Sequence, residues 1–346
     1  MRRWIPAVAC AAAVALAAGV LGRWDAAGGR RGLAAAPSGA ASRPCGGEAL
    51  AEDAFPPLGL LATGPSTARP APGGTPDAPG APDGRPEVFL PDGPAFAALL
   101  DREGAQVQMS VFRTNFSHAS PSQAANIALV ARKLTGLVIA PGASLSYNRT
   151  VGPYTEAGGF GWGRMFVGNR IVPTIGGGVC QGASTLYNAV LLADLSVIER
   201  HVHGLTVPYL DPGRDATVTE SGGLDLRFRN STAAPIVLWA QAQDRWLTVA
   251  IYGRERPPTV EVHTQVLSRQ AFATIVVPDP HLAPGTEQVA AAGQDGVRAR
   301  AWVVVHQPRG PQRRDLGEHT YRPSPRILLR GPAAPPGPSS AAATST

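Results

Sequence analysis

Hydrophobic and polar residues alternate in several stretches of the chain, a pattern typical of strands with one buried face. Val107, Met109 and Val111 alternate with polar residues and predict a strand that leads into residues 112–116. Further strands are predicted at residues 224–228, 235–240 and 246–252. The last two are close enough to form a hairpin through Gln243 and Asp244. We therefore expect an antiparallel β-sheet in this half of the chain.

A change to helical spacing follows the first strand. Ser120 suits an N-cap, Pro121 the first helical position, and Gln123 completes a capping box. Gly136 is expected to end the helix. The apolar positions that recur on one face are Ile127, Val130, Ala131 and Leu134.

A second helix is predicted at residues 179–194, directly after the three consecutive glycines 176–178. Its apolar stripe consists of Val179, Ala183, Leu186, Val190 and Ala193. Cys180 falls on the first turn, and Ser184 lies one turn further along on an adjacent stripe.

Short strands also follow Pro258, at residues 260–266, 274–277 and 297–305. The patterns together predict an α+β fold, with two main helices packed with an antiparallel β-sheet, plus a small β-rich C-terminal region. We place the main domain at residues 101–256 and the C-terminal region at residues 257–330.

The two ends of the chain have a different composition. Residues 1–25 begin with basic residues and continue into an apolar, Ala-rich stretch, which predicts an export signal, either cleaved or kept as a membrane anchor. Ala, Pro and Gly dominate residues 26–100 and predict a disordered linker; residues 331–346 predict a disordered tail. We expect the protein to be exported, as a membrane-anchored or extracellular protein of the cell envelope.

The formal net charge of +6 comes almost entirely from arginine. The arginines scatter instead of forming a stripe interleaved with aromatic residues, so no nucleic-acid partner is expected. A basic surface is compatible with acidic envelope polymers or anionic lipid. The three cysteines (Cys10, Cys45 and Cys180) do not form a recognisable disulfide framework, although a Cys45–Cys180 bridge remains an alternative.

The glycine-rich turn before Cys180 is the strongest candidate for chemistry. Adjacent glycines are expected where the backbone needs unusual dihedral angles or close approach. A thiol at a helix N-terminus lies at the positive end of the helix dipole, which favours the thiolate. His203 is the preferred base and Asp215 its orienting partner, with Glu199 a weaker option. The prediction is a nucleophile, base and orienter at Cys180, His203 and Asp215.

Two other interpretations of these residues stay open. A buried cysteine is usually a small hydrophobic residue without chemistry. Cys180, His201, His203 and Asp215 are also residue types that bind zinc, but their spacing lacks a recognised metal pattern. We expect no metal and no cofactor.

Five residues are candidates for substrate binding. Gln181 and Ser184 follow Cys180 on the same helix, and His201 alternates with His203 if this segment is extended. Arg214 suits a bidentate grip on a carboxylate, or else pairs with Asp211 or Asp215. Trp162 lies in the glycine-aromatic loop 158–163, which is expected to be either a lid that stacks on a sugar or a plain hairpin.

Several blocks of the chain, in order, resemble the VanW-like family. They are residues 112–116, 126–127, 141–148, 151–153, 177–181, 184–189, 199–203 and 213–218. Gly182 and Gly204 depart from the family pattern, which commonly has bulkier residues there. The resemblance implies an exported or membrane-anchored protein of the bacterial cell wall, in a family without a settled activity. The C-terminal region faintly resembles the glycine-rich G-five module.

Two functions follow from these observations. The first is a cysteine-dependent acyl transferase or hydrolase that acts on peptidoglycan peptides. The second is a non-catalytic module that binds peptidoglycan or another envelope polymer; a scaffold for envelope partners is a third. The membrane is expected as a partner through the N-terminal segment, and the oligomeric state is left open. Catalysis requires a sulfur that solvent can reach beside an imidazole nitrogen, whereas a binding module predicts a packed Cys180 and an exposed aromatic patch at Phe160 and Trp162.

Overall fold

The computed structural model describes residues 93–167, 170–219, 221 and 223–333. The predicted signal or anchor, the linker up to residue 92 and the tail after residue 333 lie outside the described residues. Cys10 and Cys45 are outside them as well, so the alternative bridge is not addressed. Among the helices of the described part, none combines the length and the apolar character needed to cross a bilayer.

The described residues contain four helices: α1 (Pro94–Glu103), α2 (Pro121–Leu134), α3 (Tyr147–Val151) and α4 (Val179–Leu192). The predicted start of α2 is confirmed, because the Ser120 side chain accepts from the Gln123 backbone while the Gln123 side chain accepts from the Ser120 backbone. The predicted start of α4 at Val179 is confirmed as well. The expectation of two main helices is not confirmed, since α1 and α3 were not predicted.

Helix α1 begins at Pro94, inside the stretch predicted as a linker through residue 100. The prediction followed the local Ala, Pro and Gly content and overlooked apolar residues at helical spacing. Phe96 and Leu99 pack against a cluster that contains Leu100, and the Phe96 and Tyr252 rings meet edge to face with centroids 5.8 Å apart. Burial of this apolar face stabilises the helix on the domain.

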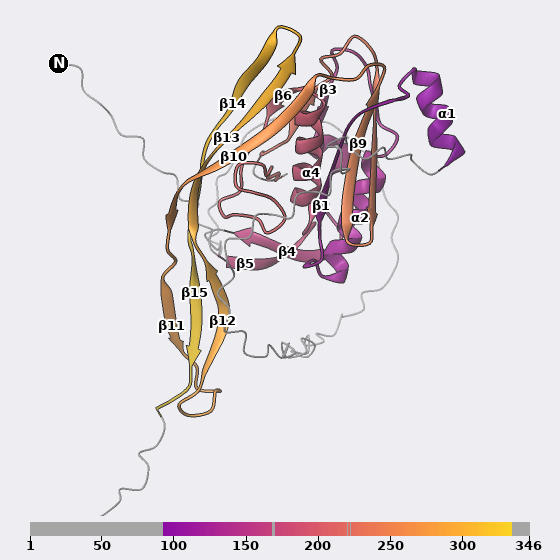
Figure 1. Cartoon of the computed structure of the whole chain (residues 1–346). Coiled ribbons are helices and arrows are strands. Elements are labelled where there is room, and N and C mark those ends of the chain that lie inside the picture. The colour runs from indigo at the N-terminus through magenta and orange to yellow at the C-terminus, as the bar shows by residue number, and fades with distance from the viewer. Residues whose placement is uncertain (1–92, 168–169, 220, 222, 334–346) are drawn as a thin grey trace, which may run out of the picture. The chain divides into compact units, whose positions relative to one another are not determined.

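The central sheet has the strand order β1-β9-β8-β2 and is antiparallel. Its strands are β1 (Val107–Asn115), β2 (Val138–Ile139), β8 (Ile236–Gln243) and β9 (Trp246–Gly253). The expected hairpin is confirmed, but its turn lies one residue later than predicted: Gln243 belongs to β8, and Asp244 and Arg245 connect β8 to β9 with positive φ angles of 49° and 65°. Helices α2 and α4 pack against this sheet (Figure 1).

Smaller strands surround α4. They are β3 (Ser144–Ser146), β6 (Ser196–Glu199) and β7 (Arg227–Arg229), which form one sheet, and the hairpin of β4 (Trp162–Val167) and β5 (Arg170–Ile175). The strand predicted at residues 224–228 is therefore shorter than expected: it begins three residues later and ends one residue later. Asp225 accounts for the difference, because its carboxylate accepts from the backbone of Asn148 and of Leu226.

The C-terminal region forms two three-stranded sheets. The first has the order β10-β13-β14 and the second the order β11-β15-β12, with β11 and β15 parallel. The strands are β10 (Thr259–Gln270), β11 (Thr274–Pro278), β12 (Glu287–Gln294), β13 (Gly296–Gln307), β14 (Gly310–Tyr321) and β15 (Ser324–Arg330). Val260, Val303 and Val305 are buried in the same hydrophobic cluster as α2 and α4. The first sheet thus shares a core with the α+β domain.

Gly182 allows α4 to pack closely on its neighbours. A Cβ atom at this position would lie 2.4 Å from the hydroxyl oxygen of Tyr147 and 2.5 Å from a methyl carbon of Val130. Tyr147 is fixed in turn, because its hydroxyl donates to the Val179 carbonyl at 2.8 Å. The missing side chain therefore has a packing reason in this chain.

We expect Gly182→Ala to lower the free energy of unfolding by about 1 to 3 kcal/mol, because the added methyl group overpacks the core. Urea denaturation measures the change. Gly204→Ala is the matched control, since nothing lies within 4 Å of a Cβ there, and it should alter stability by less than about 0.5 kcal/mol. Equal effects of the two substitutions would contradict the packing explanation.

Candidate functional site

The turn before Cys180 has the backbone geometry that its glycines allow. Strand β5 ends at Ile175, and Gly176 and Gly178 follow with φ angles of 83° and 106°. A Cβ at Gly178 would lie 3.0 Å from a carbon of Ile127 in α2. The turn therefore needs glycine both for its dihedral angles and for its distance from α2.

Asn126 of α2 holds this turn from the other side. Its amide nitrogen donates to the carbonyls of Gly161 at 3.0 Å and Gly177 at 2.9 Å, and its amide oxygen accepts from the Gly161 backbone at 2.8 Å. The side chain is buried. Sequence reasoning gave Asn126 no role in the site. The available signal was a polar residue directly beside the apolar stripe of α2.

Cys180 is one of two residues of α4 that are not buried; the other is Leu192, at the end of the helix. Every residue of α4 from Val179 to Leu191 is buried except Cys180, which is half-buried and free. Its sulfur lies 3.5 Å from the carbonyl oxygen of Val218 and 3.7 Å from the hydroxyl of Thr217. The thiol thus belongs to a half-buried residue on the first turn of a buried helix.

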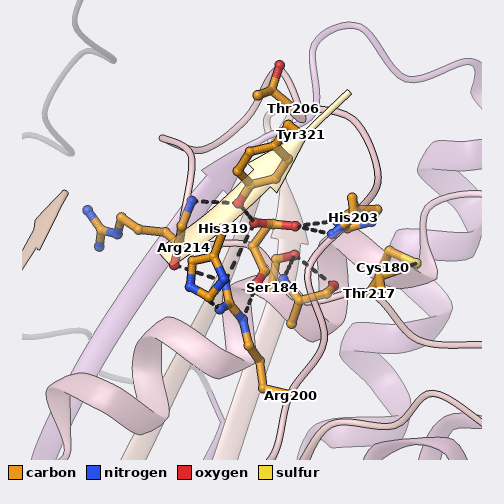
Figure 2. A network of polar contacts seen from close by, with 12 residues as sticks. Cys180, Ser184, Arg200, His203, Thr206, Arg214, Thr217, His319 and Tyr321 are labelled. Carbon is orange, nitrogen blue, oxygen red and sulfur yellow. Dashed lines mark hydrogen bonds and ion pairs between the residues drawn. The ribbon is translucent and has the colours of Figure 1, made fainter. Parts of the chain in front are cut away.

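His203 contacts Asp215, and Figure 2 shows His203 beside Cys180. Its Nδ1 atom is 2.6 Å from Oδ2 of Asp215, and its backbone N–H donates to the same oxygen at 2.7 Å. With Nδ1 engaged by the carboxylate, Nε2 is the ring nitrogen left for the thiol, and the pKa values of Cys180 and His203 are shifted by each other. The structure therefore brings together the three residues that were predicted to be nucleophile, base and orienter.

The electrostatics of the three groups favour a thiolate and an imidazolium. Burial raises the pKa of Cys180, but the hydrogen bond and charge of His203 outweigh it, so the pKa is lowered from its ordinary value. Burial lowers the pKa of His203, but hydrogen bonds with Asp215 and Cys180 raise it to about 9. For Asp215, burial raises the pKa, and the hydrogen bond with His203 brings it below its ordinary value.

Asp215 has further partners on its other oxygen. Tyr321 donates its hydroxyl to Oδ1 at 2.5 Å, and the Arg200 guanidinium lies 3.6 Å from the same atom. Arg200 also donates to the backbone carbonyls of Asp215 and Gly213, and its side chain is only 7% exposed. Sequence reasoning missed Arg200 and Tyr321. Arg200 adjoins the predicted histidines, whereas Tyr321 lies more than a hundred positions away and gave no signal.

Gln181 and Ser184 do not present free polar groups to a substrate in this structure. Gln181 is buried and donates to the Thr114 hydroxyl and the Asn115 carbonyl, both at 3.0 Å. The Ser184 hydroxyl is fully buried, donates to the Ala216 carbonyl and accepts from the Ala216 backbone N–H. Ser184 thereby ties α4 to the segment that carries Asp215. These contacts make both residues part of the support of the site.

His201, Arg214 and Trp162 lie around the site with other partners. His201 is 3.0 Å from Glu199 through Nε2, so Glu199 pairs with this histidine. The Nε of Arg214 donates to Asn188 at 2.9 Å, and its guanidinium covers the Phe112 ring.

Trp162 is 57% exposed, whereas Phe160 is buried. The exposed patch of two aromatic residues that a binding module would predict is therefore absent at this position. The zinc alternative gains no support either. In the described ranges, no group of three His, Cys, Asp or Glu side chains is arranged to hold a metal ion.

Two family models match parts of the described chain. Residues 122–252 match the family model for VanW like protein, and residues 260–333 match the model for the G5 domain. The first range contains Cys180, His203 and Asp215, and the second contains Tyr321. The faint resemblance of the C-terminal region to the G-five module is thus confirmed.

Two curated proteins are similar to this chain. The uncharacterized protein YoaR of Bacillus subtilis (strain 168) is 35% identical over 148 residues, which cover 43% of this chain and 48% of that protein. The vancomycin B-type resistance protein VanW of Enterococcus faecalis (strain ATCC 700802 / V583) is 28% identical over 138 residues, covering 38% of this chain and 50% of that protein. The chain spans about half the length of each relative.

Two solved structures match a smaller part of the chain. The G5 domain of IgA1 protease is 23% identical and covers 24% of this chain and 100% of its own, with a TM-score of 0.16. The crystal structure of HP0197-G5 is 18% identical and covers 21% of this chain and 96% of its own, with a TM-score of 0.13.

Proposed function

We propose that this chain, which carries a VanW-like domain followed by a G5 domain, is a thiol-dependent acyl transferase or hydrolase of the cell envelope. Cys180 is the nucleophile, His203 the general base and acid, and Asp215 the group that orients the imidazole. The observation that carries the proposal is the position of His203, held by Asp215 at 2.6 Å beside the half-buried thiol of Cys180.

The reaction requires these residues, a peptide as acyl donor, and water or an amine as acyl acceptor. The Cys180 thiolate attacks a carbonyl carbon, so a C–S bond forms and an electron pair moves onto the carbonyl oxygen. When the tetrahedral intermediate collapses, the C–N bond breaks and the His203 imidazolium gives its proton to the leaving nitrogen. The resulting thioester is then attacked by water or by an amine, whose proton His203 accepts, and the thiolate is released.

Helix α4 suits the stabilisation of the oxyanion in this reaction. The first backbone N–H groups of a helix have no acceptor inside the helix and carry partial positive charge. Cys180 lies on that first turn, two positions after Gly178 at the N-cap. A carbonyl oxygen that approaches the thiol therefore faces the positive end of α4 as its negative charge develops.

A peptide of the bacterial cell wall is the substrate class that fits the context. The resemblance to the VanW-like family implies a cell-wall location, and a net charge of +6 suits an acidic envelope polymer. The N-terminal 25 residues, as an export signal or anchor, would place the site on the outer side of the membrane. The proposal therefore names the stem peptides of peptidoglycan as acyl donors.

We expect the full-length protein to change the masses of purified disaccharide-peptide fragments of peptidoglycan, by losing a terminal residue or by joining two stems. Mass spectrometry of the fragments detects both outcomes. The Cys180→Ala variant should form neither product, because the nucleophile is removed. Product formation at the same rate by this variant, or none by the native protein on fragments of several species, would contradict the proposal.

Binding without catalysis is the second candidate function. Trp162 is 57% exposed, and Trp302 of β13 lies between the His263 ring and the Arg313 guanidinium on the outward face of the first C-terminal sheet. An exposed aromatic side chain such as Trp162 suits recognition of polymers, whereas Trp302 is half-buried. Co-sedimentation with purified sacculi, undiminished by Cys180→Ala, together with unchanged fragment masses would favour this function.

A further inference from the structure

We infer that Tyr321 of the G5 domain is a positioning residue of the thiol site, so that the reactivity of Cys180 depends on the packing of the G5 domain against the VanW-like domain. This inference rests on the proposed function and adds that the same site depends on a second domain. It is carried by the contacts of Tyr321 and by the way in which the segment with His203 is held.

The Tyr321 hydroxyl makes two hydrogen bonds. It donates to Oδ1 of Asp215 at 2.5 Å and accepts from the backbone N–H of Gly213 at 2.6 Å. The side chain is 2% exposed, so no solvent molecule replaces these bonds when the hydroxyl is lost. The residue thus fixes both the Asp215 carboxylate and the backbone two positions before it.

The two carboxylate oxygens of Asp215 accept hydrogen bonds from different residues. Oδ2 takes the backbone N–H and Nδ1 of His203, and Oδ1 takes the Tyr321 hydroxyl. The Arg200 guanidinium lies 3.6 Å from Oδ1. Without the hydroxyl, the attraction of Arg200 for Oδ1 is no longer balanced by a short hydrogen bond. The carboxylate is then expected to turn toward Arg200 and to weaken the Oδ2–Nδ1 contact that holds the imidazole.

The G5 domain also holds the segment on both sides of His203. Val202 packs on a buried cluster of Val297, Ala299 and Tyr321. The carbonyl of Gly204 accepts from the Arg322 backbone at 2.7 Å. His203 therefore lies between two residues that both contact the G5 domain.

Arg200 and Gly213 extend this contact. Nη1 of Arg200 is 3.1 Å from Nε2 of His319, the residue two positions before Tyr321. A Cβ at Gly213 would lie 2.9 Å from the Cβ of Ala301 in β13. The backbone around Asp215 is thus packed so tightly on the G5 domain that a shift of β14 reaches the carboxylate directly.

The test is the pH dependence of Cys180 alkylation by iodoacetamide in the full-length protein and in its Tyr321→Phe variant. We expect the variant to remain folded and the midpoint of the pH profile to rise by about one pH unit. Below the midpoint, that rise corresponds to an alkylation rate about tenfold lower. If the Tyr321 hydroxyl positions the site, its loss shifts the alkylation midpoint. A loss of stability alone would leave the midpoint unchanged.

The matched control is Val237→Ala. Val237 is fully buried on β8 and belongs to the cluster of Leu100 and Tyr252, which contains no residue of the G5 domain and no partner of Asp215. It should lower the melting temperature without moving the alkylation midpoint. Equal midpoint shifts in both variants, or none in Tyr321→Phe, would overturn the inference.

If Tyr321→Phe does not fold, incorporation of 3,5-difluorotyrosine at position 321 replaces it, because the fluorines strengthen the hydroxyl as a donor while keeping the ring. An altered midpoint then supports the positioning role, and an unchanged midpoint overturns it. If the native thiol has a low midpoint and neither Tyr321→Phe nor the fluorinated tyrosine moves it, this inference is overturned while the proposed function stands. A native thiol with an ordinary midpoint would contradict the proposed function.

Discussion

Replacing Asp215 by alanine is expected to lower the free energy of unfolding by about 3 to 5 kcal/mol, the cost of removing one partner from a buried ion pair. The Asp215 carboxylate is 1% exposed and lies 3.6 Å from the Arg200 guanidinium, which is itself 7% exposed. It also accepts hydrogen bonds from His203 and Tyr321. The variant leaves these donors and a buried positive charge without their acceptor. Urea denaturation of the native and variant proteins at pH 7 measures the loss.

Two features separate this expectation from a general effect of losing a carboxylate. Asp101→Ala removes an exposed aspartate of α1 and should change stability by less than about 0.5 kcal/mol. Because the pKa of Asp215 in the folded protein is below the ordinary 3.8, its contribution is present above pH 3.8 and is lost as the pH falls through the lower, folded-state value. The difference between native protein and Asp215→Ala should shrink there. A loss below about 1 kcal/mol at pH 7 would show that Arg200 finds sufficient partners elsewhere.

Replacing His203 by alanine is expected to slow the alkylation of Cys180 at pH 7 by about tenfold or more. The native imidazole has its pKa raised to about 9 and so stays protonated at neutral pH, next to the sulfur. Without it, burial is the main influence on the thiol, and burial raises the pKa of Cys180. A thiol with a pKa of about 8.5 or higher is only a few per cent thiolate at pH 7. Timed labelling with iodoacetamide and intact mass measurement give the rate.

The control for this variant is His201→Ala. His201 is two residues away and pairs with Glu199, so its removal should leave the rate within about twofold of the native value. Similar slowing by both substitutions would indicate a general disturbance of the segment. No slowing by His203→Ala would show that the imidazole does not activate the sulfur.

The main elements were predictable because their signals are local. The start of α2 is set by Ser120, Pro121 and Gln123, which lie within four positions of one another and act through hydrogen bonds of one turn. The β8–β9 hairpin likewise depends on two neighbouring strands and a short turn. Helix α1 was missed because its stability comes from packing on Tyr252, far away in the sequence.

In the candidate site, too, some residues could be predicted from the sequence and others could not. Cys180, with its glycine turn, and His203 with Asp215 carry their chemistry in their residue types, so a sequence singles them out. The polar stripe of α4 was misleading, because Gln181 and Ser184 lie beside Cys180 on the helix yet are buried under other segments. Helical spacing gives the face of a helix, and only the tertiary fold decides whether that face meets solvent.

The residues that support Asp215 required the three-dimensional structure. The hydrogen bond from Tyr321 to Asp215 joins positions 106 residues apart, in two regions that match different family models. No sequence pattern within either region indicates a contact with the other region. Arg200 appeared in the sequence as one more arginine in a chain rich in them, and its burial distinguishes it.

The pH dependence of Cys180 alkylation in the native, full-length protein tests most directly whether this thiol is an activated nucleophile. The structure predicts labelling of the folded protein with a midpoint below the roughly 8.5 of a free thiol, because the hydrogen bond and charge of His203 lower the pKa of Cys180. A midpoint at or above 8.5, or labelling only after unfolding, would contradict the thiol mechanism and make Cys180 a residue of the core.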